Sequence, residues 1–315
     1  MRVAVVGAGA MGSMFGAHLA LDGHDVTLVD VDAAHVSAIA ERGLTMRFAS
    51  ESRTVRLRAT TDPVHELAEV DAVIVLCKGW ANDVAARSIA HALGPTSTVV
   101  TIQNGLGNDT SLATVLGPEC VVSGTTTAGA HRPEPGIVDV SPITSAGQSI
   151  TQLGQAGDDA TVLQSTRDLA DALSSAGLPC EILPDATAII WRKLALAATA
   201  GPLTAAMGVT VEAMMDSSAA RDLLRGLFDE IAALALAADV EFDTDAVWEH
   251  AITTFQAVGA HTTSMADDFA EGRRSEIDSF CVAISKLGRA HRIPTPTHDA
   301  IGQLLVAREQ AGGLR

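Results

Sequence analysis

A glycine-rich turn near the start of the chain has the spacing of a dinucleotide-binding motif. Residues 7–12 read GAGAMG, after an apolar run at residues 3–6 and before a helical pattern that Gly23 closes. In such a motif the first glycine permits a tight turn, the second lets the backbone approach a pyrophosphate, and the third lets helix and strand pack closely. The N-terminus of the helix then offers free N–H groups to the phosphates. We therefore expect a phosphate cradle made of Gly7, Ala8, Gly9, Ala10, Met11 and Gly12; the alternative is a glycine turn in a sheet that binds no nucleotide.

Asp30 follows the next apolar run, at residues 26–29, and indicates which dinucleotide binds. A carboxylate at the end of the second strand accepts hydrogen bonds from the adenosine ribose and repels a 2′-phosphate. No arginine or lysine occurs between Asp30 and Arg42, so nothing nearby in the sequence attracts that phosphate. We therefore expect NAD(H) to be favoured over NADP(H). Asp32 either shares this role or caps the helix that begins near Ala33.

The composition argues against several classes of protein and ligand. The 315 residues are 47% hydrophobic, which suits one large or two medium domains, and their formal charge is −17. Nucleic acid and anionic membrane are not expected as partners, because both require a basic surface. The four cysteines are far apart and form no metal-binding cluster, so we expect no metal site and a reducing, cytoplasmic location. The apolar start is not expected to be an export signal, because its glycines fit a phosphate turn. The absence of tyrosine excludes dehydrogenase mechanisms that use a Tyr–Lys pair.

The first half of the chain alternates strand and helix patterns. Residues 71–77 and 98–102 are apolar runs typical of buried parallel strands, and Lys78 and Asn104 follow them. Ligands of doubly wound sheets bind at the carboxyl ends of the strands, so both side chains should face the cofactor. Residues 44–60 indicate a hairpin or an irregular excursion. Residues 121–153 contain β-rich segments, which we expect to add antiparallel strands to the same sheet.

The second half of the chain has helical patterns throughout. A helix at residues 158–176 and a strand at 180–183 come before a boundary at Pro184-Asp185. We predict an α/β fold with a Rossmann-type dinucleotide-binding domain at residues 1–184 and an all-α domain at 185–315. Its helices are expected at residues 186–200, 217–238, 245–260 and 265–271, from Ser275 onward, and after Pro296. The uncharged stretch 194–211 contains Gly201-Pro202, so it predicts a buried, interrupted helix rather than a membrane span.

Lys193 is the residue of the helical domain best suited to acid–base chemistry. A hydride-transfer enzyme needs a group that protonates the oxygen that becomes an alkoxide, and donors that hold a substrate carboxylate. Lys193 lies in a mostly apolar helix at the start of this domain, where we expect a cleft between the two domains. The alternative is a lysine that extends to the surface, which is the usual arrangement of helical lysines.

Beyond these single features, the chain resembles the ketopantoate (2-dehydropantoate) reductase family from residue 1 to about 300. The resemblance rests on the order and spacing of GAGAMG, LCKGW, IQNGLG, GTTTAGA, IIWRKLALAATAGPLTA, TTSMADDFAEGRRSEID and HRIPTP. It implies a Rossmann domain followed by a helical domain similar to the C-terminal domain of 6-phosphogluconate dehydrogenase. It also implies reduction of a 2-oxo acid at a nicotinamide.

The resemblance also assigns roles to individual residues. Lys193 matches the general acid of the family, and Asn104 matches the residue that hydrogen-bonds substrate and orients the lysine. The other matches are Ser264 as a substrate hydroxyl donor, Glu276 as a carboxylate near the cofactor, Lys78 beside the nicotinamide nucleotide and Ala128 as a backbone cofactor contact. Each has a structural alternative, since Asn before Gly is common in turns. Glu276, after the possible N-cap Ser275, is also favoured by the helix dipole alone.

Several positions depart from the family pattern. Two asparagines that line the pantoate site in the family are replaced here by Ala197 and Gly201. A third asparagine of the family is replaced at about Val211. The basic residue with which the family binds the 2′-phosphate of NADP is replaced at about Val31. Losing several hydrogen-bonding groups predicts a less hydroxylated substrate, because unmatched polar groups are costly. His261 either adds a donor to the same pocket or is a surface histidine.

We therefore expect an NAD(H)-preferring oxidoreductase that acts on a small 2-oxo or 2-hydroxy acid other than pantoate, as a homodimer. Lys193 and Asn104 are the expected catalytic residues, with Ser264 and His261 in the substrate site. One alternative is a true 2-dehydropantoate 2-reductase of pantothenate biosynthesis, and another is a non-catalytic NAD-binding regulatory protein.

Overall fold

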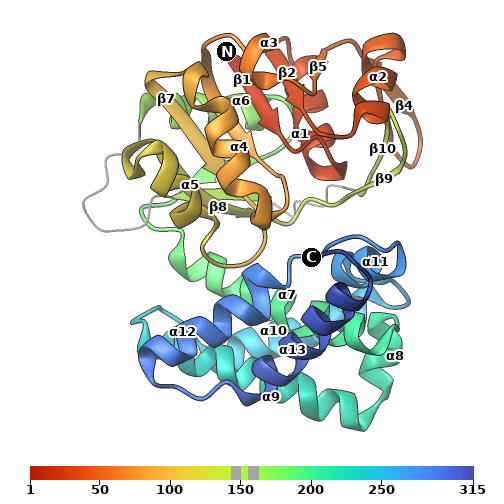
Figure 1. The fold of residues 1–315 in the computed structure, drawn as a ribbon, viewed down its shortest axis with the longest axis vertical. Coiled ribbons are helices and arrows are strands. Elements are labelled where there is room, and N and C mark those ends of the chain that lie inside the picture. Colours follow the sequence, from red (N-terminus) through yellow and green to blue (C-terminus); the bar gives the residue numbers. More distant parts are fainter. Residues whose placement is uncertain (143–149, 155–162) are drawn as a thin grey trace. The chain divides into compact units, whose positions relative to one another are not determined.

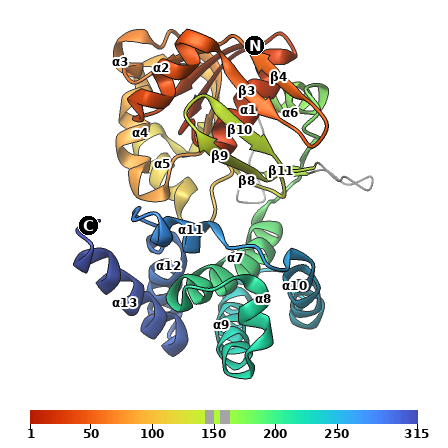
Figure 2. The same ribbon diagram turned by 90° about the vertical axis from the view of Figure 1, so that its right-hand side faces the viewer.

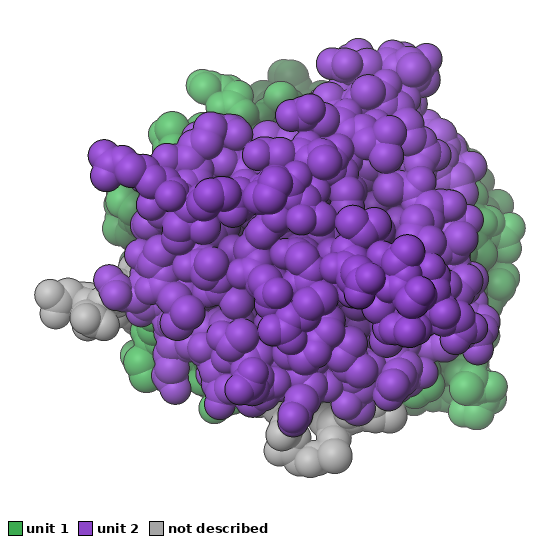
Figure 3. Space-filling model, turned by 90° about the horizontal axis from the view of Figure 1, so that it is seen from below, with its two compact units in different colours: residues 1–103, 108–186 green, residues 104–107, 187–315 purple. Residues whose placement is uncertain are grey.

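The computed structural model describes residues 1–142, 150–154 and 163–315, which form two compact units. Unit 1 comprises Met1–Gln103 and Asn108–Ala186, and unit 2 comprises Asn104–Gly107 and Thr187–Arg315. Figure 3 shows the two units in different colours. The short segment Asn104–Gly107 groups with unit 2 although both of its flanks belong to unit 1.

Unit 1 is built on a mainly parallel sheet (Figure 1). Within the described residues the sheet has eight strands in the order β12-β11-β8-β7-β6-β1-β2-β5, and only β11 and β8 pair in antiparallel fashion. The strands are β1 (Arg2–Val6), β2 (Asp25–Val29), β5 (Arg58–Thr60), β6 (Val70–Val75), β7 (Leu93–Thr101), β8 (Val121–Thr126), β11 (Thr151–Gly154) and β12 (Cys180–Ile182).

The central strands of this sheet are buried on both faces, because their consecutive residues point to opposite sides. In β1, Val3 and Val5 belong to one hydrophobic core, and Ala4 and Val6 belong to another. Helices α1 (Ala10–Leu21) and α6 (Gln164–Ser175) contribute to the first core, while α4 (Asn82–Ile89) and α5 (Asn108–Leu116) contribute to the second. The remaining helices of unit 1 are α2 (Ala33–Arg42), α3 (Pro63–Glu66) and the 3-10 turns Gly79–Ala81, Ala90–Ala92 and Pro118–Cys120. The predicted doubly wound α/β fold is confirmed; of the helix expected at 158–176, residues 158–162 lie outside the described residues.

A second, four-stranded sheet was not expected. It has the order β4-β3-β10-β9, from β3 (Leu44–Arg47), β4 (Ser52–Val55), β9 (Ala130–Glu134) and β10 (Ile137–Val140). The β3–β4 hairpin confirms the hairpin predicted within residues 44–60. The expectation for residues 121–153 is confirmed in part, since β8 and β11 join the main sheet and pair with each other in antiparallel fashion. It is wrong in two respects, because β8 runs parallel to β7, and β9 and β10 leave the main sheet. β9 is polar, and its residues are exposed or half-buried, whereas Val138 and Val140 of β10 belong to the same hydrophobic core as α1. Figure 2 shows β9 and β10 beside α1. Residues 143–149 of that stretch lie outside the described residues.

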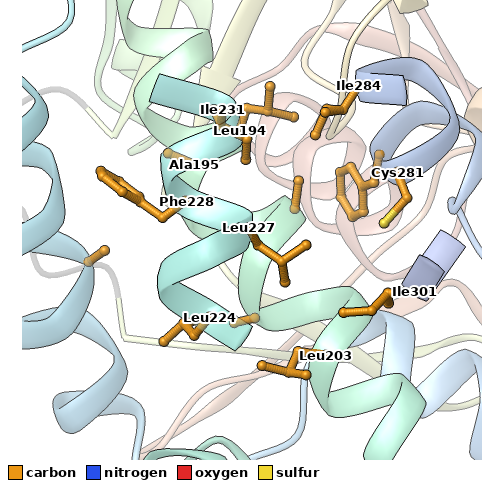
Figure 4. Close-up of a cluster of buried hydrophobic side chains, with 14 of the residues drawn as sticks. Leu194, Ala195, Leu203, Leu224, Leu227, Phe228, Ile231, Cys281, Ile284 and Ile301 are labelled. Atoms are coloured by element: carbon orange, nitrogen blue, oxygen red, sulfur yellow. The ribbon is translucent and has the colours of Figure 1, made fainter. Parts of the chain in front are cut away.

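Apart from Asn104–Gly107, unit 2 is helical, and its long helix α7 (Thr187–Met207) packs against α9, α11 and α13. Its other helices are α8 (Val211–Asp216), α9 (Ser218–Ala237), α10 (Thr244–Val258), α11 (Ser264–Ala270), the π-helical turn η4 (Asp278–Val282), α12 (Ala283–His291) and α13 (Pro296–Ala311). Figure 4 shows side chains of this hydrophobic core, among them Leu194 of α7, Leu227 and Phe228 of α9 and Cys281 of η4.

Two sequence expectations for unit 2 need correction. The helix was expected to be interrupted at Gly201-Pro202, but α7 continues to Met207, and Gly208 with φ +67° follows its end. Proline in a helix removes one hydrogen bond at a cost of about 3 kcal/mol, and the burial of Leu203, Thr204 and Ala205 opposes that cost. The helix expected from Ser275 is regular only from Ala283, because a π-helical turn comes first. No helix formed by the described residues is long and apolar enough to cross a membrane.

Candidate active site

The glycine turn of unit 1 has the geometry of a phosphate cradle. Gly7 has φ +92°, and a Cβ there would lie 2.3 Å from the backbone nitrogen of Cys77. A Cβ on Gly12 would lie 2.1 Å from the carbonyl oxygen of Gly7, so helix α1 can pack this closely only with glycine there. At Gly9, by contrast, a Cβ would meet no atom of the described protein within 4 Å. The backbone at Gly9, the N-cap of α1, is therefore open to a ligand, as a pyrophosphate requires.

Asp30, which follows the carboxyl end of β2, is held by hydrogen bonds of its backbone and of its side chain. The Asp30 N–H donates to the carbonyl oxygen of Thr60 over 3.1 Å, and Asp30 Oδ1 accepts the N–H of Asp32 over 2.9 Å. Asp32 is the N-cap of α2, where its Oδ1 accepts the N–H groups of Ala34 and His35, each over 3.1 Å. Asp32 is thus the helix cap, and Asp30 stays the residue predicted to bind the ribose.

A basic side chain lies close to this acidic end, although none was expected from the neighbouring sequence. Arg132 of β9 donates from Nη1 to Asp32 Oδ2 over 2.7 Å. Burial would raise the pKa of Asp32, but the hydrogen bonds from Arg132 and from the His35 N–H hold that pKa below its ordinary value. The sequence near Asp30 did not indicate this basic side chain, because Arg132 and Asp32 are 100 positions apart in the sequence and meet only in the fold.

Gln103, which was not predicted as a site residue, joins the carboxyl ends of β6 and β7. Its Nε2 donates to the carbonyl oxygen of Cys77 and, over 2.8 Å, to Asn82 Oδ1. Lys78 and Ala128 lie after β6 and β8, and both are half-buried. The N–H of Ala128 donates to Thr126 Oγ1 over 3.1 Å. The position of Gln103 between a strand end and the Asn-Gly turn was a signal that could have identified it.

Lys193 is a half-buried residue of α7 in unit 2, between the buried Trp191 and Leu194. Burial lowers the pKa of Lys193 to about 8, and the negative charge of Glu276 acts in the opposite direction. An amine with a pKa near neutrality exchanges protons far more readily at physiological pH than an ordinary lysine does. This side chain therefore has the acid–base property that hydride transfer to a carbonyl requires.

The Asn104–Gly107 segment is fixed to unit 2 at Ser279, three residues after Glu276. Gly105 has φ +91°, and a Cβ there would lie 2.5 Å from the carbonyl oxygen of Ser279. The N–H of Leu106 donates to the same oxygen over 2.9 Å. Ser279 lies in the π-helical turn that follows Glu276, so one short element holds both the Glu276 region and the backbone next to Asn104. Turns of this kind occur frequently at functional sites.

The predicted substrate residues Ser264 and His261 are both exposed within the described structure. Ser264 begins α11, whose N-cap Thr263 is bonded through Oγ1 to Thr204 Oγ1 of α7 over 2.8 Å. His261 accepts the N–H of Val211 on its carbonyl oxygen over 2.9 Å, so its backbone is anchored while its side chain is exposed. The hydroxyl pair that positions Ser264 was not identified from the sequence.

Lys193, Ala197 and Gly201 lie four residues apart and so share one face of α7. A Cβ on Gly201 would lie 3.8 Å from the ring of Phe280 and 3.9 Å from Cβ of Met265. The face that carries the lysine therefore continues into apolar surroundings.

Comparisons with known proteins identify the family of this chain. Residues 3–146 match the family model described as ketopantoate reductase PanE/ApbA, and residues 185–309 match the model of its C-terminal part. A 2-dehydropantoate 2-reductase of Halobacterium salinarum is 30% identical over 315 residues, which cover 99% of this chain and 100% of that protein. The enzyme of the same name from Lactococcus lactis is 28% identical over 98% of both chains.

Solved structures are similar over the whole chain. The ternary structure of D-mandelate dehydrogenase with NADH and anilino(oxo)acetate has a TM-score of 0.91 and 28% identity, covering 99% of this chain and 100% of that one. A PanE/ApbA family ketopantoate reductase from Ralstonia eutropha has a TM-score of 0.88 and 26% identity, with the same coverage. This protein is an oxidoreductase that acts on CH–OH groups, and it belongs to the ketopantoate reductase family.

Proposed function

We propose that this protein is an NAD(H)-preferring enzyme that interconverts a small 2-oxo acid and the matching 2-hydroxy acid. The observation that carries the proposal is Lys193, whose pKa is lowered to about 8 by burial and which is under the influence of Glu276. The nicotinamide, when bound, exchanges a hydride between its C4 and the C2 of the substrate. The remaining chemistry is proton transfer and positioning, which the side chains of the protein perform.

Lys193 is proposed to be the general acid in reduction. Its ammonium donates a proton to the oxygen on C2 as the carbonyl becomes an alkoxide, and in oxidation the neutral amine accepts the proton of the hydroxyl. Asn104 is proposed to hydrogen-bond the substrate and to orient Lys193, and Ser264 to bind the substrate, with His261 a further candidate. The glycine turn, Asp30, Lys78, Ala128 and Glu276 are the proposed cofactor contacts.

The proposed preference for NAD(H) rests on Asp30. Its carboxylate stands at the end of β2, where the adenosine ribose binds in Rossmann folds, and Val31 occupies the place of the basic residue of the family. The structural similarity to a D-mandelate dehydrogenase whose structure contains NADH supports the same preference.

The proposed substrate is a 2-oxo acid with an apolar side chain rather than ketopantoate. Ala197 and Gly201 cannot hydrogen-bond substrate hydroxyls with their side chains, and Gly201 lies beside Phe280 and Met265. A polar substrate group left without a partner costs about 1–3 kcal/mol. The names of the curated relatives favour 2-dehydropantoate as the second candidate.

A substrate panel tests the proposal. Steady-state rates with NADH and NADPH are measured for benzoylformate, aliphatic 2-oxo acids and ketopantoate, followed by nucleotide absorbance. We expect the highest kcat/KM with NADH and an apolar 2-oxo acid. Ala197→Asn should shift the ratio of kcat/KM toward ketopantoate, and the exposed Arg192→Asn is the control that should leave it unchanged. Highest activity of the unaltered enzyme with ketopantoate and NADPH would establish the second candidate instead.

A homodimer and a reducing, cytoplasmic environment are also proposed. The first rests on the family resemblance, and the second on the four cysteines, none of which forms a disulfide within the described residues. Light scattering of the purified protein tests the first, and activity with and without reductant tests the second.

A further inference from the structure

The ion pair between Asp32 and Arg132 lies beside the residue predicted to bind the adenosine ribose. We propose that this pair sets the cofactor selectivity of the enzyme, because Asp32 holds Arg132 back from the position that a 2′-phosphate would take. The inference rests on the proposed NAD(H) preference and explains how the fold maintains it. It assigns to Arg132 a capacity for 2′-phosphate recognition that Asp32 suppresses.

The contacts connect the arginine to the ribose site through one residue. Arg132 Nη1 lies 2.7 Å from Asp32 Oδ2, and the backbone N–H of Asp32 donates to Asp30 Oδ1 over 2.9 Å. The side chains of Arg132 and Asp32 are 30% and 33% exposed, so a ligand has access to both. A phosphate on the ribose that Asp30 binds would therefore arrive close to a guanidinium that is already paired.

The position of Arg132 is fixed by the second sheet. It lies on β9, which pairs with β10 and packs against α1, the helix that begins at the glycine turn (Figure 2). His35, buried in α2, joins these parts, since its Nε2 lies 3.0 Å from Ser13 Oγ of α1 and its Nδ1 accepts the N–H of Gly136 over 2.9 Å. The backbone that carries Arg132 is thus tied to the nucleotide-binding elements.

Charge explains why the pair excludes a phosphate. Two carboxylates, Asp30 and Asp32, accompany one guanidinium, so the local charge is negative and repels a phosphate dianion. Once Asp32 is neutral, Asp30 and Arg132 balance each other. The planar guanidinium is then available for the bidentate pairing with phosphate that arginine forms well.

Asp32→Asn is the decisive variant, because asparagine is as good an N-cap as aspartate and α2 keeps its first hydrogen bonds. The dissociation constants of NADH and NADPH are measured by fluorescence titration for wild type, Asp32→Asn, Arg132→Gln and the double variant. We expect Asp32→Asn to raise the NADPH affinity relative to NADH by about tenfold, the effect of one charge-assisted hydrogen bond. The gain should disappear in the double variant and weaken with added salt.

The outcomes separate this inference from the proposed function. An unchanged affinity ratio in Asp32→Asn, or a gain that the double variant retains, would overturn the role of Arg132 while the NAD(H) enzyme stands. Tighter wild-type binding of NADPH than of NADH would overturn both the cofactor preference and the restraint by Asp32. Failure to bind either nucleotide would reject the proposed function itself. Thermal unfolding of each variant checks that the fold is retained.

Discussion

The N–H of Leu106 donates to the carbonyl oxygen of Ser279 over 2.9 Å, and this bond joins two segments that are more than 170 positions apart in the sequence. Ser279 lies in the turn after Glu276, and Leu106 lies two residues after Asn104. Glu276 in turn acts on the charge of Lys193. The backbone next to Asn104 is therefore tied to the turn after Glu276, and Glu276 is coupled to Lys193 through its charge.

Gly105→Ala should damage the site strongly, and Gly107→Ala should not. Both glycines have positive φ, +91° and +81°, but only at Gly105 would a Cβ approach Ser279, to 2.5 Å from its carbonyl oxygen. Both substitutions pay the backbone cost of about 1–2 kcal/mol. Gly105→Ala must in addition displace the segment, so we expect a larger fall in melting temperature and a loss of kcat/KM. Equal effects of the two variants would show that contact with Ser279 is unimportant.

Lys193→Ala should lower turnover strongly while leaving NADH binding nearly intact. General acid catalysis contributes typically 10²–10⁴-fold to a rate, so a loss in about that range is expected in both reaction directions. Arg192→Ala is the matched control, because Arg192 is the exposed neighbour on the same helix. Rates are compared at saturating substrate, and NADH affinity is measured separately. Unchanged turnover would remove Lys193 from the mechanism.

The pH dependence of the rate should report the lowered pKa of Lys193. Reduction needs the ammonium form, so kcat/KM should be constant at low pH and fall as the pH rises through about 8. Oxidation needs the neutral amine, so its kcat/KM should rise as the pH rises through about 8. In Lys193→Arg any residual activity should lack both limbs near pH 8, because arginine stays charged. A limb nearer the ordinary lysine value of 10.5 would contradict the assignment.

Glu276→Gln should move that limb to lower pH. The negative charge of Glu276 stabilises the ammonium of Lys193 and raises its pKa, so removal of the charge lowers the pKa further. Reduction should then be lost at a lower pH than in the wild type. The exposed Glu271→Gln, which changes charge elsewhere in unit 2, serves as the control. A shift to higher pH would mean that Glu276 acts on Lys193 in another way.

Gly9→Ala should separate folding from nucleotide binding. A Cβ at Gly9 would meet no described protein atom within 4 Å, and φ there is −63°, so the melting temperature should stay almost unchanged. The same Cβ would stand where a pyrophosphate approaches the backbone, so NADH affinity should fall by at least about tenfold. Retained affinity would place the phosphates elsewhere.

Local sequence patterns predicted the elements that support the nucleotide site. The GAGAMG turn, the apolar runs of β1, β2, β6 and β7 and the cap at Asp32 each depend on neighbours within a few residues. The long helices of unit 2 were predicted for the same reason. Only α7 is longer than expected, because core packing around Pro202 outweighs a local helix-breaking signal.

Contacts between distant segments were not predictable in this way. Arg132 reaches Asp32 across 100 positions, and β9 and β10 join β3 rather than the main sheet. Neither contact produces a periodic pattern in the sequence, because each depends on which distant segments the tertiary fold brings together. The resemblance to a family supplied Lys193, Asn104 and Glu276 as a set, whereas spacing alone left each with an ordinary structural explanation.

The grouping of Asn104–Gly107 with unit 2 has a consequence for dissecting the protein. A fragment that begins at Thr187 would contain every helix of that unit but would lack Asn104–Gly107, of which Gly105 and Leu106 contact Ser279. The turn after Glu276 would lose the hydrogen bond from the Leu106 N–H, and water would reach the carbonyl oxygen of Ser279 instead. A C-terminal half obtained by limited proteolysis or by separate expression should therefore have all of its helices but an incomplete site. A peptide that spans Asn104–Gly107, added to this half, should restore the missing contact with Ser279.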